Sequence, residues 1–132
     1  MALERAEMTF DEASDLWFIE HFKSAGSRQR GDAEACLARW RSVFPSEQIH
    51  AFLFDDVARS PLETLVKVAN HIGVDGEFFR SVSEEELKKP VFSGSGHPLR
   101  PKLRQFLKIQ YGHKIARLQE MLNRDLSHWL SD

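Results

Sequence analysis

The sequence predicts a chain that is mostly α-helical and contains one buried strand near residues 48–54. Apolar residues recur at helical spacing through most of the chain, and capping residues, prolines and glycines mark where helices start and stop. One apolar run, 49–54, is short and bounded by polar residues, which is typical of a buried strand. The 132 residues, 42% of them hydrophobic, are enough for a packed core in one domain.

Two helices are predicted before the strand. The first covers about residues 9–26 and begins at a capping box formed by Thr9 and Glu12. The polar segment 24–31 is predicted to be a loop. The second helix covers about residues 32–44, because its apolar residues fall on one helical stripe and a proline follows.

The strand is followed by the clearest helix signal in the chain. Ser60 can cap this helix, Pro61 suits its first position, and Glu63 completes a capping box. Apolar residues then recur at helical spacing as far as Ile72. Gly73 suits the left-handed residue that ends many helices.

The last third of the chain is predicted to be helical apart from one loop. Short helical turns are expected within residues 77–88, and residues 89–98 form a polar loop. Helical patterning resumes at Pro101 and continues in two apolar stripes with Gly112 between them. The terminal segment contains Asp-Leu-Ser-His-Trp-Leu at 125–130.

A lone strand cannot satisfy its own backbone hydrogen bonds. A buried strand pairs its N–H and C=O groups with neighbouring strands, and no second segment of this chain has comparable strand character. We therefore expect either another chain to supply the partners or this chain to be a fragment of a larger sheet protein.

Bulk composition narrows the functional classes. The formal net charge of −2 gives no general attraction to nucleic acid or to anionic membranes. No segment approaches the roughly 18 consecutive apolar residues of a membrane helix, and the charged start does not resemble a signal peptide. The single cysteine, Cys36, allows no intrachain disulfide and indicates a reducing, cytoplasmic compartment. The scattered histidines give no metal-site spacing.

The most suggestive chemistry lies in the loop before the last helix. Two glycines allow close approach of a ligand, and serines and a histidine offer hydrogen bonds. Basic residues follow with no acidic residue until Glu120, an arrangement that suits a phosphate-bearing ligand. A flexible connector followed by a solvated helix face is the alternative interpretation. The loop residues are Ser93, Gly94, Ser95, Gly96 and His97, and the basic residues are Arg100, Lys102, Arg104, Lys108, Lys114 and Arg117.

Several segments, taken in order, resemble one enzyme family. Residues 31–48 are similar to a helical stretch before a late strand, and 52–65 to a strand end followed by a helix that begins near proline. Residues 99–118 and the Asp-Leu-Ser-His-Trp ending at 125–129 are similar to terminal helices. Together these segments resemble the bacterial sulfotransferases that use 3′-phosphoadenylyl sulfate (PAPS), over nearly the whole chain.

The resemblance implies a fold, a reaction and a set of binding residues. The family fold is α/β, a P-loop-like parallel sheet with helices, and residues 1–132 would form its C-terminal portion as a single partial domain. The family transfers a sulfuryl group from PAPS to a hydroxyl or an amine without a metal. The residues implied to bind the nucleotide are Phe54, Ser93, Gly94, Ser95, Gly96, His97 and Arg100, and no catalytic residue is implied.

The resemblance also implies what is missing. The loop that cradles the 5′-phosphosulfate and the residues that hold the 3′-phosphate have no counterpart in this sequence, so we expect no activity from the chain alone. The expected partner is an upstream-encoded half of the same domain or a second copy of the chain, and neither a membrane nor a nucleic acid. The alternative function is that of a non-catalytic remnant or protein-interaction module.

Overall fold

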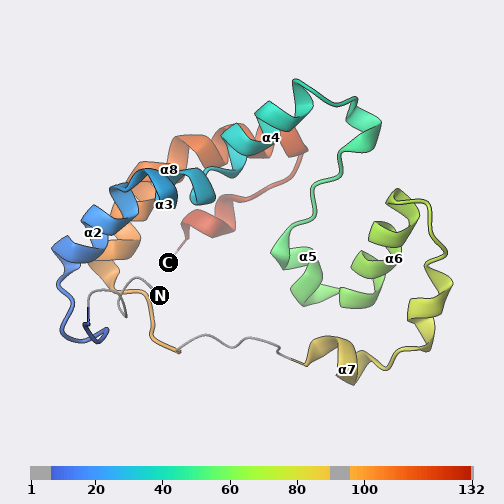
Figure 1. Cartoon of the computed structure of the whole chain (residues 1–132), viewed down its shortest axis with the longest axis horizontal. Helices are drawn as coiled ribbons and strands as arrows, with labels where there is room; N and C mark the ends of the chain where they lie inside the picture. Colours follow the sequence, from blue (N-terminus) through green and yellow to red (C-terminus); the bar gives the residue numbers. More distant parts are fainter. Residues whose placement is uncertain (1–6, 90–95, 132) are drawn as a thin grey trace. The chain divides into compact units, whose positions relative to one another are not determined.

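The computed structural model describes residues 7–89 and 96–131, and in these segments all regular structure is helical. The chain divides into two compact units (Figure 1). Unit 1 comprises residues 1–40 and 96–132, and unit 2 comprises residues 41–95. The α/β fold predicted from the family resemblance is therefore wrong for this chain, because the structure is all-α.

Unit 1 is built around one long helix. In Figure 1 helices α2, α3 and α4 follow one another along α8, and the C-terminal segment folds back. Contacts join α2 to α3, α2 to α8, and α8 to the terminal turn η3. The elements are α2 (Asp15–Lys23), α3 (Ala25–Gly31), α4 (Ala33–Arg41, whose last residue begins unit 2), α8 (Pro101–Leu122) and η3 (Ser127–Leu130).

The core of unit 1 lies where α2 meets the start of α8. Ala13, Phe18 and Leu103 are buried together. Aromatic side chains surround them: the Phe18 ring lies 5.4 Å from that of Phe10, and the Phe22 ring lies 6.5 Å from that of Phe106 on α8. Aromatic burial of this kind contributes much of the stability of a small helical unit.

The chain turns back at the end of α8. Asn123 takes the left-handed conformation (φ 50°) that ends a helix. The N–H of Leu126 then donates to Oε1 of Gln119 at 2.7 Å. Leu126 is fully buried, so this turn is fixed by packing as well as by a hydrogen bond and brings η3 onto α8.

The first half of unit 1 differs from prediction in where its helices begin. The capping box is present, with the Thr9 N–H donating to Glu12 Oε2 at 2.8 Å, but it closes a turn, and α2 begins at Asp15 after Ser14. The predicted loop at 24–31 is wrong. Ser24 caps a further helix there, α3, by accepting a hydrogen bond from the Ser27 N–H.

Unit 2 is a smaller helical unit. Helix α6 contacts α5, η2 and α7. Its inner face buries Pro61, Thr64, Val66 and Ala69, and Gly76 comes so close to Val66 that a Cβ there would lie 3.1 Å from Cγ1 of Val66. The elements are η1 (Ser46–Gln48), α5 (Phe54–Arg59), α6 (Pro61–His71), η2 (Glu77–Ser81) and α7 (Glu84–Lys88).

The strand predicted near residues 48–54 is also wrong. Ile49 and Leu53 do have extended backbones, but no ladder forms within the described segments. Phe54 instead begins α5, whose first turn contains Asp55 and Asp56, and carboxylates are favourable at a helix N-terminus. A short apolar run is compatible with a strand and also with a buried segment that leads into a helix. The apolar pattern therefore could not distinguish the two structures.

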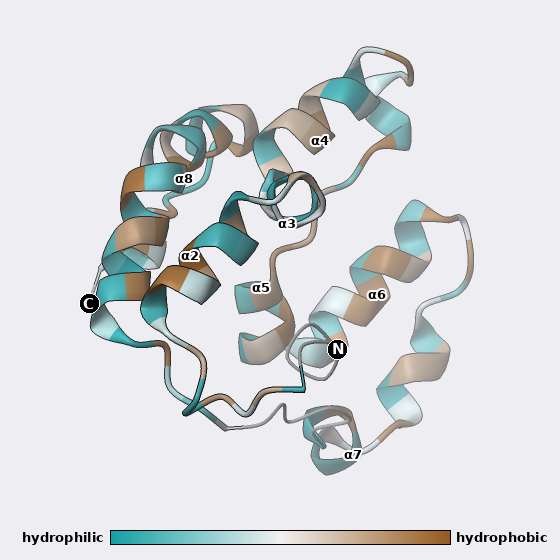
Figure 2. Cartoon of the chain, turned by 60° about the vertical axis from the view of Figure 1, so that its left-hand side comes forward, coloured by the Kyte–Doolittle hydropathy of each residue, from teal (hydrophilic) through white to brown (hydrophobic). Residues whose placement is uncertain are grey.

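The prediction for α6 is confirmed in its main features. Pro61 occupies the first turn, and Gly73 has a left-handed φ of +78° just past the helix end. Hydrophobic and hydrophilic residues alternate along α6 in Figure 2, as expected for an amphipathic helix. The capping box does not form: the Ser60 side chain makes no cap hydrogen bond, and Glu63 pairs with Arg80 at 3.4 Å.

Candidate functional site

The predicted nucleotide-binding residues are distributed over both units. Ser93, Gly94 and Ser95 lie outside the described residues. Gly96 and His97 belong to unit 1, where the His97 ring stacks on Phe10 with centroids 4.3 Å apart and planes 8° apart. Phe54 belongs to unit 2 and is 79% exposed at the start of α5.

Arg100 is engaged with the protein itself. Its guanidinium donates to the carbonyl oxygens of Phe10 at 2.6 Å and Ala13 at 2.8 Å, and to Oδ1 of Asp15 at 3.0 Å. It also lies over the rings of Phe10 and Phe18, at 4.7 and 5.2 Å from their centroids. Arg100 thus ties the start of α2 and the segment before it to the start of α8, and three of its five N–H donors are used within the protein.

A cavity of about 300 Å³ in unit 1 is the best candidate site, and we call it the aromatic cavity. Its wall is mostly apolar, with Tyr111 and Trp129 as large rings and four charged side chains among the lining. Leu99, three residues after Gly96, lines its edge. The lining residues are Gly31, Ala33, Glu34, Leu99, Arg104, Leu107, Lys108, Tyr111, Lys114, Ile115, Leu118, Trp129 and Leu130.

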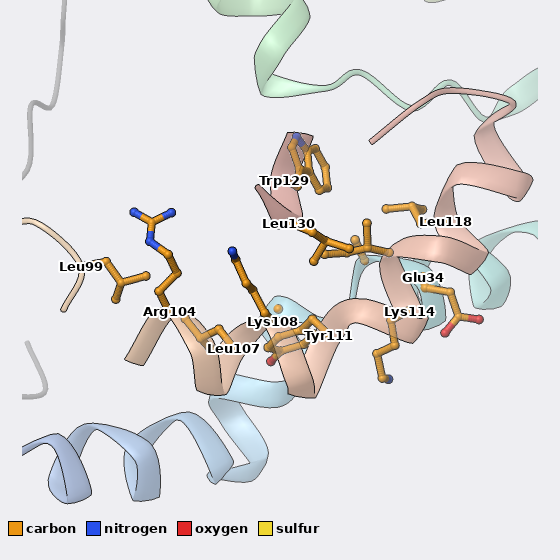
Figure 3. A pocket seen from close by; sticks show the side chains of 13 residues that line it. Glu34, Leu99, Arg104, Leu107, Lys108, Tyr111, Lys114, Leu118, Trp129 and Leu130 are labelled. Atoms are coloured by element: carbon orange, nitrogen blue, oxygen red, sulfur yellow. The ribbon is translucent and has the colours of Figure 1, made fainter. Parts of the chain in front are cut away.

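Two neighbouring basic side chains, Arg104 and Lys108, line this cavity. Figure 3 shows Arg104 and Lys108 projecting from α8 towards the side on which Trp129 lies. The two residues are four positions apart, so they share one helix face. No ion pair to Arg104 is found within residues 7–89 and 96–131, and its guanidinium is therefore available to an anionic ligand.

Two charged side chains of the lining, Lys114 and Glu34, form ion pairs within the protein. The Lys114 ammonium bonds Oδ2 of Asp32, and Glu34 faces Arg117 at 3.8 Å. Bonding to Lys114 holds the pKa of the Asp32 carboxyl below its usual value, and the Ala35 N–H, which donates to Oδ1 at 3.2 Å, acts in the same direction. The aromatic cavity thus has a positive charge at Arg104 that no ion pair in the described segments balances, and Lys108 is a second basic residue of the same wall.

A glycine shapes the wall of the cavity. A Cβ added at Gly31 would lie 2.8 Å from Oη of Tyr111. The end of α3 can approach Tyr111 this closely because position 31 has no side chain. Gly31 therefore helps to place the tyrosine ring in the wall.

Of the residues that line this cavity, the basic ones were noted from the sequence, and the aromatic ones were not considered as ligand-binding residues. Arg104, Lys108 and Lys114 were among the basic residues expected to face a phosphate-bearing ligand, and all three line the cavity. Tyr111 belongs to the apolar stripe that precedes Gly112, and Trp129 lies in the terminal segment 125–130, so neither position suggests a ligand site. The signal that could have found Tyr111 is its spacing from Arg104 and Lys108 on one face of α8.

The part of the chain that the structure describes contains neither a candidate metal site nor a candidate membrane-spanning helix. There, no group of three or more His, Cys, Asp and Glu side chains could hold a metal ion. None of the helices in these same residues is both long and apolar enough to cross a bilayer. No protein-family model matches the chain, and no curated protein or solved structure shows significant similarity to it.

Proposed function

We propose that this chain is a sulfotransferase-like protein whose aromatic cavity binds the nucleotide part of PAPS. The family reaction transfers the sulfuryl group of PAPS to a hydroxyl or amine acceptor. The proposal combines the order of family-like segments along the sequence with one structural observation, the joining of an aromatic wall to a positive edge in a single cavity. We also propose that the protein is cytoplasmic, because a chain with a single cysteine suits a reducing compartment.

The cavity chemistry supports a nucleotide ligand. Tyr111 and Trp129 offer ring faces on which a purine can stack. Arg104 offers a planar fork of donors that suits phosphate oxygens, and Lys108 adds a second positive charge four residues away. The volume of about 300 Å³ lies at the small end of ligand sites, so we expect the base and one phosphate group to be held there.

We further propose that the chain alone does not catalyse transfer. Charge develops on the transferred group, and catalysis needs fixed donors aimed at that position. To stabilise this charge the aromatic cavity has two long basic side chains, Arg104 and Lys108. Within the described residues, its lining has no general base paired with an acceptor-activating group. A second protein would complete the site. Formation of a sulfated product from labelled PAPS by the purified chain would contradict this part of the proposal.

The direct test is calorimetric titration with adenosine 3′,5′-bisphosphate, the spent donor. We expect a Kd of about 100 μM or tighter, which corresponds to about −5.5 kcal/mol. Replacing Arg104 and Lys108 together by Ala should weaken binding at least about tenfold, because each removes a charge-assisted contact. Lys102→Ala is a control for the loss of charge outside the cavity; it removes one charge from the same helix, against two in the double variant. Equal affinity in all variants would reject the site.

A second candidate function is that of a protein-interaction module, favoured by unit 2. Large apolar side chains are exposed there: Phe54 is 79%, Phe78 71% and Ile72 65% exposed. Where such side chains form one contiguous patch, the patch is typical of a surface that contacts a partner. The partner could be a second copy of the chain, and measuring the molar mass against concentration tests this directly.

A further inference from the structure

A second cavity, of about 380 Å³, adjoins the aromatic cavity in unit 1, and we call it the basic cavity. The two share Tyr111 and Lys114 in their walls, so α8 contributes to both. The remaining wall comes from the end of α2 and from α3. The lining residues are Lys23, Ala25, Arg28, Gln29, Asp32, Gln110, Tyr111 and Lys114.

The charge of the basic cavity is positive. Lys114 and Asp32 neutralise each other across its wall. Lys23 pairs with Glu20 at 2.9 Å, but both side chains are more than half exposed, so solvent screens that pair. Arg28 has no ion-pair partner within the described segments. An anion entering the cavity therefore meets Arg28 and Lys23 without displacing a buried ion pair.

One buried donor in this wall has no partner. Nε2 of Gln110 is inaccessible to solvent and makes no hydrogen bond with any described residue. The carboxylate of Asp32 cannot serve it readily, because Oδ1 accepts from the Ala35 N–H at 3.2 Å and Oδ2 from Lys114. Arg28 and Lys23 carry donors only. Buried amide donors are nearly always satisfied, so a rotation of the Gln110 side chain that brings this amide to the cavity, where an acceptor from outside the chain can meet it, is expected to be favourable.

We propose that the basic cavity is a binding subsite for an oxyanion group of a small molecule. Gln110 supplies a hydrogen-bond donor when its amide turns towards the cavity, and Arg28 and Lys23 supply the positive charge. A carboxylate and a sulfate or phosphate share the chemistry that this site requires, namely acceptor oxygens and negative charge. The inference rests on the basic cavity alone and does not depend on the nucleotide proposal.

The test is a titration followed by NMR, with sodium sulfate and sodium acetate as probes and sodium chloride holding the ionic strength constant. Saturable shifts of the Gln110 side-chain amide and of the backbone amides of residues 28–32 are expected with at least one probe. The tighter probe identifies the ligand as a tetrahedral oxyanion or a carboxylate. The absence of a saturable response to either probe overturns the proposal.

Variants decide whether the response comes from this cavity. Arg28→Ala and Gln110→Leu should each weaken probe binding at least about tenfold, judged from the backbone amides. Arg30→Ala and Gln105→Leu are the matched controls, because they remove the same groups from α3 and α8 outside the cavity. Weakening by Arg30→Ala as large as that by Arg28→Ala would mean general attraction of anions and would overturn the proposal. Circular dichroism checks that each variant is folded.

Discussion

Arg100 shows how one side chain can be mistaken for a ligand-binding group. Its position at the end of a polar glycine loop suits a phosphate contact, yet three hydrogen bonds and two aromatic rings hold its guanidinium inside unit 1. A sequence shows that a cation is present, but the acceptors that surround it come from the fold. Carbonyl oxygens of a distant segment leave no sequence signal.

We therefore predict that Arg100→Ala acts on stability. It removes charge-assisted hydrogen bonds and leaves the carbonyls of Phe10 and Ala13 without their donor, so the free energy of unfolding should fall by about 2–3 kcal/mol. Urea denaturation measures this change. Nucleotide affinity of the folded variant should equal that of the parent chain, and a selective loss of affinity with unchanged stability would contradict the structural role.

Asp32 gives a prediction on pH. Its carboxyl pKa is lowered mainly by Lys114, so the stability it contributes is present above the ordinary carboxyl pKa and is lost as the pH falls below about 4. Asp32→Ala should cost about 1–2 kcal/mol at pH 7, because α4 also loses its cap. Asp32→Asn keeps a capping oxygen and should cost less. The urea midpoints of both variants at pH 7 and pH 3 measure these changes in stability. If both variants lose as much stability between pH 7 and pH 3 as the parent chain does, the pairing of Asp32 with Lys114 is refuted.

At the scale of elements, sequence periodicity was sufficient to predict the helices whose ends are marked by clear start and stop residues. α6 and α8 begin at prolines, and each is followed within two residues by a residue with left-handed backbone, Gly73 or Asn123. Short segments were harder, because their state depends on what caps or packs against them. α3 has no apolar stripe to detect and is held at its start by Ser24, while the apolar run before α5 carries no sign of whether a strand will pair with it.

Gly112, inside α8, provides a test at this scale. A Cβ there would meet nothing within 4 Å, and the helix is continuous through this position. Gly112→Ala should raise the free energy of unfolding by about 0.5–1 kcal/mol, because glycine loses more backbone entropy than alanine in a helix. Thermal unfolding measures the gain. Gly31→Ala is the contrasting variant and should show no gain, since its Cβ would lie 2.8 Å from Oη of Tyr111.

On the scale of the whole molecule, the inference from a lone strand to a missing sheet was wrong. The strand does not exist in the described segments, so the all-α structure does not require partner strands. The positive edge of the aromatic cavity could be anticipated from the run of basic residues after Arg100. The aromatic wall could not, because it forms only when the chain turns at Asn123 and carries Trp129 back to α8.

Exposed apolar residues give a prediction for the whole chain. If unit 2 mediates association of two copies, the Phe54→Ser and Phe78→Ser double variant should have a lower weight-average mass than the parent chain at high concentration. Light scattering over a concentration series measures this. Leu16→Ser is the matched control, because Leu16 is 66% exposed but lies in unit 1. A parent chain that stays monomeric throughout would exclude self-association.

The most direct test of the nucleotide site uses the three tryptophan indole N–H signals in a nitrogen-15 NMR spectrum. Only Trp129 lines the aromatic cavity; Trp17 packs in the core of unit 1, and Trp40 lies in α4. Titration with adenosine 3′,5′-bisphosphate should shift the Trp129 signal saturably and leave the Trp17 signal unchanged. In the Arg104→Ala and Lys108→Ala double variant, the same titration should no longer shift the Trp129 signal. A Trp129 signal that does not move, in a folded chain, would contradict the central claim.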